Sequence, residues 1–274
     1  MKIISKDNSN KNKVLLAILA ICILLPLLNI IIWSFTERWP WPHLFPETYS
    51  LRGLKEIFSR KNEMIQLFIS SIILSIIVAI FSVIIGLMTA RAFVFYDFKW
   101  KNQIYFASIL PFLIPCTVFA MGIHVTFIKL GLSNTMLGVI IVHLIYSLPY
   151  ATRLLIDGTQ AVGTKLEEQA KVLGATTFQA FTKVTLPILS PVILSSLSMS
   201  YIVSFSQYFL TLLIGGGKIK TFTIVMFPYI SGGDRNIAAA YTLVFLGITM
   251  IIFSFFNYIV SKFNKNISTD FYSI

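Results

Sequence analysis

The long apolar stretches of this sequence contain few side chains that could bind a ligand, transfer a proton or react. His124 and His143 lie in two of them; either could be a ligand or part of a proton relay, but lone histidines without carboxylate neighbours are more often hydrogen-bonded structural groups. Cys22 and Cys116 also lie in apolar stretches. We expect both to be small buried hydrophobic residues rather than a disulfide or a metal pair. No catalytic residue and no metal site is predicted.

Gly215-Gly216-Gly217-Lys218 is the segment whose composition comes closest to a phosphate-binding loop. That loop needs a glycine four residues before a Gly-Lys pair, and then Ser or Thr. Position 212, where the first glycine would stand, is Leu and position 219 is Ile, so the pattern fails. The segment is predicted to be a turn, and no cofactor is expected in this chain.

The composition is that of a membrane protein. The 274 residues are 56% hydrophobic and 12% charged, against roughly 25% charged in soluble domains. The mean hydropathy is +0.81. The net charge of +11 comes from basic residues scattered among short loops, which disfavours nucleic-acid binding and fits positively charged loops at one membrane face.

Stretches without charged residues divide the chain into six segments, each long enough to cross a bilayer, which takes about 20 apolar residues. They are 14–36, 64–90, 102–128, 130–152, 184–217 and 236–261. We therefore predict an all-α integral membrane protein with six transmembrane helices. The first is expected to stay in the mature protein, because no small-residue cleavage pattern follows it.

Prolines and tryptophans mark the irregular parts. Pro111 and Pro115 predict a kinked or broken third span, which could line a transport path or reflect packing alone. Trp39 and Trp41 are typical of a membrane interface. Within the loop 37–63, residues 51–58 could form a short surface helix. The uncharged run 221–233 is too short to cross and is predicted to be an external or re-entrant segment.

The N-terminal tail sets the predicted orientation, because the charges before the first helix usually dominate it. Residues 1–13 contain Lys2, Lys6, Lys11 and Lys13. We expect this tail and the tail 263–274 to be cytoplasmic, an arrangement with both termini inside (N-in/C-in). Residues 14–36 form the first span, 37–63 lie outside, and 64–262 form the main transmembrane domain.

The polar segment Thr164–Pro187 lies between two of these spans and would then be cytoplasmic. Thr164 with Glu167, and Thr176 with Gln179, have the spacing of helix-capping boxes. Gly174 between them could end the first helix and turn the chain. Leu186-Pro187 is predicted to stop the second helix. By spacing alone, an amphipathic helix pair resting on the membrane is also possible.

The same segment resembles the loop of permease subunits from binding-protein-dependent ABC importers. That loop reads Glu-Ala-Ala, three residues, Gly, nine residues, Ile, one residue, Leu-Pro. Here Glu168-Gln169-Ala170 is followed at these spacings by Gly174, Val184 and Leu186-Pro187. Gln169 replaces Ala and Val184 replaces Ile. The resemblance extends over most of residues 65–260.

The resemblance implies the type I ABC importer permease fold in a bacterial inner membrane, and a multi-pass chain that is not itself an enzyme. The loop 164–187 would dock on an ABC ATPase subunit, which binds ATP and Mg²⁺. A second permease subunit, identical or homologous, and an extracytoplasmic solute-binding protein would be the other partners, with no nucleic acid. The loop residues implied in coupling are Glu167, Glu168, Ala170, Gly174, Ala175, Phe178, Val184, Leu186 and Pro187.

The wording Lys-Val-Leu-Gly-Ala at 171–175 resembles the branch that imports polyamines, ferric iron, thiamine or phosphonates. A polyamine-type cation is the first expectation for the substrate. The alternatives are a secondary transporter driven by an ion gradient and a membrane-embedded enzyme. The first would favour intramembrane carboxylates and repeated halves, and the second paired His, Asp or Glu motifs, none of which we find.

Overall fold

The computed structural model describes residues 6–40 and 42–271, with side chains for residues 13–40, 42–259 and 261–262. Trp41, predicted at the membrane interface, lies outside these residues. The chain folds into two compact units, each described by itself below: residues 1–64 with 226–248, and residues 65–225 with 249–274. We call them unit 1 and unit 2.

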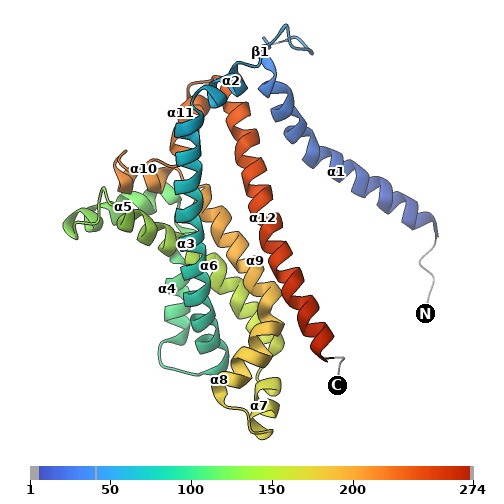
Figure 1. The fold of residues 1–274 in the computed structure, drawn as a ribbon, viewed down its shortest axis with the longest axis vertical. Coiled ribbons are helices and arrows are strands. Elements are labelled where there is room, and N and C mark those ends of the chain that lie inside the picture. Colours follow the sequence, from blue (N-terminus) through green and yellow to red (C-terminus); the bar gives the residue numbers. More distant parts are fainter. Residues whose placement is uncertain (1–5, 41, 272–274) are drawn as a thin grey trace. The chain divides into compact units, whose positions relative to one another are not determined.

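The described residues are mostly helical (Figure 1). In chain order the elements are α1 (Lys6–Ser34), β1 (Thr36–Arg38), β2 (Thr48–Tyr49), α2 (Arg52–Ser59), α3 (Lys61–Phe95), α4 (Lys101–Leu113), α5 (Cys116–Lys129), α6 (Met136–Val162), α7 (Lys165–Val172), α8 (Thr177–Ala180), the π-helix η1 (Phe181–Thr185), α9 (Leu186–Phe205), α10 (Phe209–Gly215), α11 (Phe222–Ser231) and α12 (Arg235–Phe271).

The predicted spans are confirmed as helices. Five described helical segments are long and apolar enough to cross a membrane, and the pair α4 and α5 makes a sixth if it counts as one span. The chain bends by 110° between these two helices. Ile114 is extended and Pro115 caps α5, so the break falls where the two prolines predicted it. Helix α11 is short, as expected for the run 221–233.

Three helices of unit 2, α3, α6 and α9, pack closely around small residues. A Cβ atom on Gly86 would lie 3.0 Å from Leu155 Cδ1, and one on Gly158 would lie 2.7 Å from Val192 Cγ1. Such contacts let helix backbones approach each other in a membrane, where apolar burial drives association only weakly. Ser82 and Ser147 add a buried hydrogen bond of 2.8 Å between α3 and α6.

The two histidines of unit 2 are hydrogen-bonded, as predicted for structural groups. His143 is fully buried, with Nδ1 3.0 Å from Ser204 Oγ and Nε2 2.9 Å from Thr211 Oγ1. These contacts join α6 to α9 and α10. His124 Nε2 lies 3.5 Å from Ser133 Oγ. The predicted turn at 215–218 is also confirmed, since Gly216 and Gly217 have positive φ.

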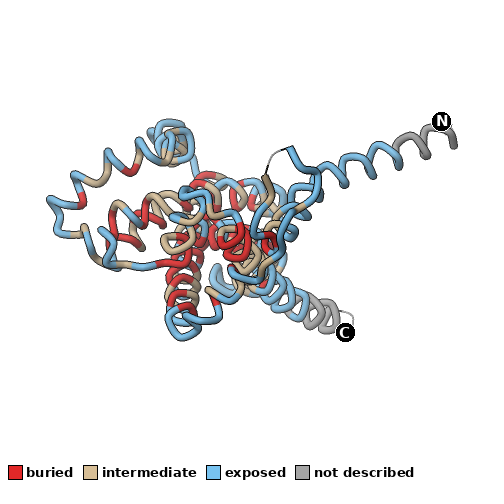
Figure 2. Tube along the Cα trace, turned by 90° about the horizontal axis from the view of Figure 1, so that it is seen from above, coloured by how far each residue is buried: buried red, intermediate tan, exposed pale blue. Residues whose placement is uncertain are grey.

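Helix α1 belongs to unit 1 and is exposed along most of its described length (Figure 2). The prediction that Cys22 is buried is therefore wrong within the chain, because this helix turns no face into a protein core. Cys116 in unit 2 is half-buried, and both cysteines are free. An apolar helix of this kind is covered by lipid or by another subunit rather than by its own chain.

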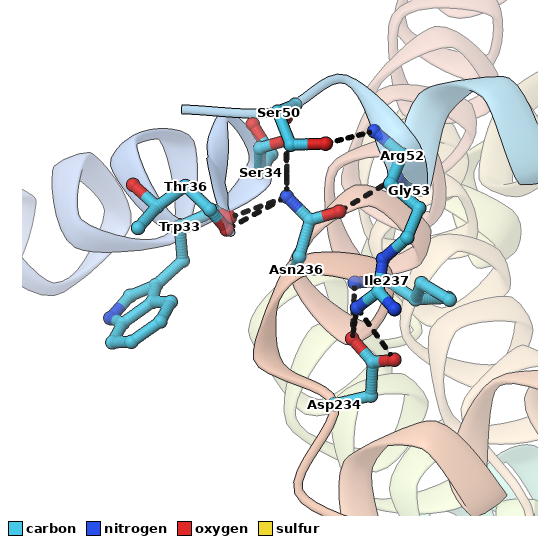
Figure 3. Close-up of polar contacts among 9 residues, drawn as sticks. All are labelled: Trp33, Ser34, Thr36, Ser50, Arg52, Gly53, Asp234, Asn236 and Ile237. Carbon is cyan, nitrogen blue, oxygen red and sulfur yellow. Dashed lines mark hydrogen bonds and ion pairs between the residues drawn. The ribbon is translucent and has the colours of Figure 1, made fainter. Parts of the chain in front are cut away.

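Three segments of unit 1 meet at one buried side chain, Asn236, at the start of α12 (Figure 3). Its Nδ2 lies 3.3, 3.2 and 2.9 Å from the backbone oxygens of Trp33, Ser34 and Thr36, where α1 ends. Its Oδ1 accepts a 2.7 Å hydrogen bond from the N–H of Gly53 in α2. One amide side chain thus satisfies backbone groups that both helices leave unpaired.

An ion pair beside Asn236 closes the same junction. Arg52 Nη2 lies 2.8 and 2.9 Å from the two carboxylate oxygens of Asp234, whose Oδ1 also accepts from the N–H of Ile237 and caps α12 (Figure 3). A Cβ on Gly53 would lie only 2.8 Å from the Asn236 backbone oxygen. The predicted helix at 51–58 is thus confirmed as α2 and tied to α12. We call these contacts the Asn236 junction.

Replacing Asn236 by Ala leaves buried carbonyl groups and the Gly53 N–H without this partner. We expect a loss of about 1–3 kcal/mol in the stability of unit 1, the range for an unsatisfied buried polar group. Protease cleavage within the loop 37–51 of the purified protein should accelerate accordingly. Asn62→Ala, at an exposed position, is the control and should change nothing. Equal cleavage rates for the two variants would contradict the junction's role.

Candidate functional site

The segment 164–187 forms two short helices joined by a tight turn (Figure 1). Helix α7 ends in a Schellman motif: the Ala175 N–H donates to the Ala170 oxygen and the Gly174 N–H to the Lys171 oxygen, both at 3.0 Å. Gly174 has φ +92°, a backbone conformation that side chains disfavour. The predicted turn at Gly174 is confirmed, and it is a defined structure rather than a loose loop.

Of the two predicted capping boxes, the second is confirmed and the first is wrong. Thr176 Oγ1 accepts from the Gln179 N–H at 3.2 Å, and Gln179 Oε1 accepts from the Thr176 N–H at 2.9 Å. Thr164 does precede α7, but its side chain makes no capping bond. Glu167 is buried and is used elsewhere, because it binds groups from two other helices.

Glu167 is the centre of a buried polar cluster in unit 2. The Arg91 guanidinium, at the end of α3, donates to both carboxylate oxygens, at 2.6 and 3.1 Å. Thr185 Oγ1, in η1, donates to Glu167 Oε1 at 2.6 Å. These bonds, with that from Arg91 the strongest, hold the pKa of Glu167 below its ordinary value despite burial.

Two aromatic rings enclose the Arg91 guanidinium. Its Cζ lies 4.6 Å from the ring centre of Phe181 and 5.1 Å from that of Phe95. Such cation–π contacts strengthen as the cation loses water. Arg91 therefore connects α3 to α7 through Glu167 and to η1 through Phe181. We call Arg91, Glu167, Thr185 and Phe181 the Arg91 cluster.

The second helix does not stop at Leu186-Pro187, so that prediction is wrong. The helix is continuous over residues 177–205 and passes through the π-helical turn η1, in which the Leu186 N–H donates to the Phe181 oxygen. Pro187 lacks an N–H and its ring crowds the preceding turn. A π-turn widens the helix just there, so the chain continues directly into α9.

The nine residues predicted for coupling fall into two groups. Glu168, Gly174, Phe178 and Leu186 are exposed, whereas Ala170, Ala175, Val184 and Pro187 are half-buried and Glu167 is buried. Apolar side chains dominate the exposed group and its neighbours: the exposed fractions are 87% for Val172, 88% for Leu173 and 75% for Phe178. Adjacent large apolar side chains this exposed are typical of an interaction surface.

Arg91, Thr185 and Phe181 were missing from the predicted site. Arg91 lies far from the loop in the sequence and could be seen there only as one more positive charge. A single arginine at the end of an uncharged run is only a weak indication that it binds a buried carboxylate. Nothing in the spacing of the residues indicates which carboxylate of the loop Arg91 binds.

A family comparison identifies the chain's relatives. Residues 82–265, more than half of the chain, match the family described as binding-protein-dependent transport system inner membrane component. The chain belongs to this family. It is a permease, a multi-pass membrane component of a transport system rather than a catalytic subunit, and the predicted resemblance is confirmed.

Curated relatives of the permease carry several substrate names. The sulfate transport system permease protein CysT of Salmonella typhimurium is 24% identical over 72% of this chain and 76% of its own length. The spermidine/putrescine permease PotC of Haemophilus influenzae is 23% identical, over 75% and 80%. The putative 2-aminoethylphosphonate permease PhnV of Salmonella typhi is 24% identical, over 83% and 86%.

A solved structure shares the fold of the permease. One chain of a bacterial ABC transporter involved in the import of the acidic polysaccharide alginate aligns with a TM-score of 0.63 at 17% identity, over 93% of this chain and 98% of that chain. This likeness shows the type I importer permease fold, as predicted. At this identity the likeness is one of fold alone.

The buried carboxylate of Glu167 gives a pH-dependent prediction. Its folded pKa is lowered, so its contribution to stability is full above its ordinary pKa of 4.5 and is lost as the pH falls through the lower folded value. Glu167→Gln should cost about 1.5–3 kcal/mol at pH 7, the range for hydrogen bonds to charged groups.

Thermal unfolding of wild type and Glu167→Gln in detergent, between pH 7 and pH 3, measures this. The difference in melting temperature should shrink steadily below pH 4.5. Glu168→Gln removes the adjacent exposed carboxylate and is the matched control. If the difference in melting temperature between wild type and Glu167→Gln stays constant down to pH 3, the ionised carboxylate of Glu167 does not contribute to stability through Arg91.

Proposed function

We propose that residues 164–187 are the element through which this permease docks on an ABC ATPase subunit. The observation that carries the proposal is the exposure of Val172, Leu173 and Phe178 on both sides of a rigid turn. An ATPase groove that received them would bury this apolar surface. The Schellman turn and the capping box keep the two helices at a fixed angle, which a lever requires.

The Arg91 cluster supplies the path from that lever into the membrane. Movement of α7 pulls on Glu167 and hence on Arg91 at the end of α3, while movement of α8 passes through η1 into α9 without a joint. ATP binding that closes a pair of ATPase subunits would thereby shift two spans together. ATP and Mg²⁺ are bound by the partner subunit in this proposal.

The whole importer would contain two permease subunits, two ATPase subunits and a solute-binding protein. Support for the last comes from the family's description as binding-protein-dependent. The loop 164–187 must then face the cytoplasm, which fits an N-terminus on the same side. On the predicted topology the loop 37–63, and with it the Asn236 junction, would be extracytoplasmic, where the solute-binding protein delivers its cargo.

Substitution at the turn tests the docking element. We expect Gly174→Val to abolish co-purification of the ATPase and transport while leaving membrane insertion intact, because a β-branched residue resists a φ of +92°. Glu168→Lys should act similarly, by placing a positive charge in the first turn of α7.

Gly131→Val is the matched control. Gly131 also has positive φ, +69°, and like Gly174 has no atom within 4 Å of an added Cβ, so it meets the same backbone strain outside the loop. This variant should retain the ATPase. Wild-type co-purification and uptake in both Gly174→Val and Glu168→Lys would show that the loop is not the coupling element, and would remove the support for its cytoplasmic location.

For the substrate, we propose a small polar or charged solute, with a polyamine-type cation as first candidate and an organophosphonate or ferric ion next; thiamine belongs to the same branch. The support is the wording of residues 171–175 and the printed names of two relatives, PotC and PhnV. The relative named for sulfate widens the set to oxyanions.

A thermal-shift screen of the partner solute-binding protein tests the substrate. The panel is spermidine, putrescine, thiamine, 2-aminoethylphosphonate, ferric iron, sulfate, molybdate and maltodextrins. We expect a polyamine to raise the melting temperature most. Stabilisation by a maltodextrin alone would overturn the branch assignment and leave the importer assignment intact.

A further inference from the structure

A cavity of about 450 Å³ lies in unit 2 between α4, α6 and α9. Its walls are almost wholly apolar and include Ile109, Phe112 and Leu113 of α4 and Met199 of α9. Arg153 on α6 is the one charged residue of its lining. The volume falls within the range of small-molecule pockets, about 300–1,000 Å³.

The charged group stands at one end of this cavity. Arg153 is the first charged residue after the uncharged run 130–152, and Tyr105 lies one turn after Lys101, which precedes the run 102–128. Arg153 Nη1 donates to Tyr105 Oη at 2.7 Å, so the two helices reach the same membrane face there. Arg153 lies about 25 Å along α6 from Met136, close to the roughly 30 Å of a hydrocarbon core.

The rest of the lining leads away from that face into the bilayer. Along α4, Ile109, Phe112 and Leu113 lie progressively farther from Lys101, and along α6 Pro149 and Tyr150 precede Arg153. The cavity is thus an apolar cleft with the Arg153 guanidinium at the end nearest the membrane face. It suits an amphiphile with an anionic head and a hydrocarbon tail, and suits a hydrated solute poorly.

The guanidinium has donors left for such a head group. Besides Tyr105, its recorded contact among the described residues is Asp157, whose Oδ2 lies 3.3 Å from Arg153 Nε. These contacts use two of the five N–H groups of arginine. A phosphate oxygen can accept the others in the paired geometry that arginine favours. Basic pockets between transmembrane helices at the cytoplasmic face bind anionic lipid head groups by this chemistry.

We propose that the cleft binds one anionic phospholipid, with its phosphate on Arg153 and an acyl chain along Ile109, Phe112, Leu113 and Met199. The lipid would fill the cavity between α4, α6 and α9. The proposal rests on Arg153 lying at a membrane face and stands independently of the coupling role of residues 164–187.

Native mass spectrometry of the purified full-length permease tests this, with phosphatidylglycerol and phosphatidylethanolamine of identical acyl chains as probes. We expect one phosphatidylglycerol to remain bound, and phosphatidylethanolamine to bind more weakly. Arg153→Gln should lower the phosphatidylglycerol affinity roughly tenfold, which is the loss of about 1.4 kcal/mol from a charge-assisted contact. Met199→Trp, which fills the cleft, should lower the affinity for both lipids.

Two control variants separate the cleft from general effects. Lys99→Gln removes an exposed cation outside the cleft lining, and Met250→Trp adds the same bulk on α12. Both should retain the lipid. If Arg153→Gln does not purify as a single species, Met199→Trp against Met250→Trp decides the question alone.

Three results would overturn the proposal. Equal binding of the two lipids, unchanged by Arg153→Gln, would show that the cleft does not recognise an anionic head group. Full displacement of phosphatidylglycerol by inorganic phosphate would make the site a free-anion site. A disulfide between two copies of Phe112→Cys, made without Cys22 and Cys116, would show that a second permease covers the cleft. Co-purification of the ATPase, measured on the same variants, reports separately on the proposed coupling function.

Discussion

The buried ion pair between Arg91 and Glu167 determines how the short helix α7 attaches to the helices of unit 2. Helix α7 has eight residues and is too short to be stable alone, because helix nucleation costs more than a few bonds return. The ion pair fixes it to α3, and the bond from Thr185 fixes it to the continuous helix 177–205. Without Glu167, Arg91 would remain as a charge between two aromatic rings with no counter-ion.

Much of the fold could be predicted from the sequence because its signals are local. Uncharged runs identify spans since charged side chains are expensive in a bilayer, and Pro111 and Pro115 mark the break between α4 and α5. The same holds for part of the site. The turn at Gly174 and the capping box of Thr176 and Gln179 are formed by hydrogen bonds between residues three to five apart, so the local spacing is enough to predict them.

The rest depended on partners distant in sequence. Glu167 has the spacing of a capping residue for Thr164, and nothing local reveals that Arg91 competes for it and wins, with two charge-assisted bonds against one to a backbone N–H. Pro187 predicts a helix end, but a helix already held on both sides can absorb the missing donor in a π-turn. Cys22 was expected to be buried because an apolar run alone does not show whether protein or lipid covers it.

The Asn236 junction also has a consequence for biosynthesis. The backbone carbonyl groups at the end of α1 bind the side chain of Asn236, which is synthesised about 200 residues after them. At about 5–20 residues per second, translation takes roughly 10–40 seconds to cover that distance. During this interval the end of α1 lacks the side chain that later binds its carbonyl groups. The junction can therefore form only after the start of α12 has been synthesised, late in the production of the chain.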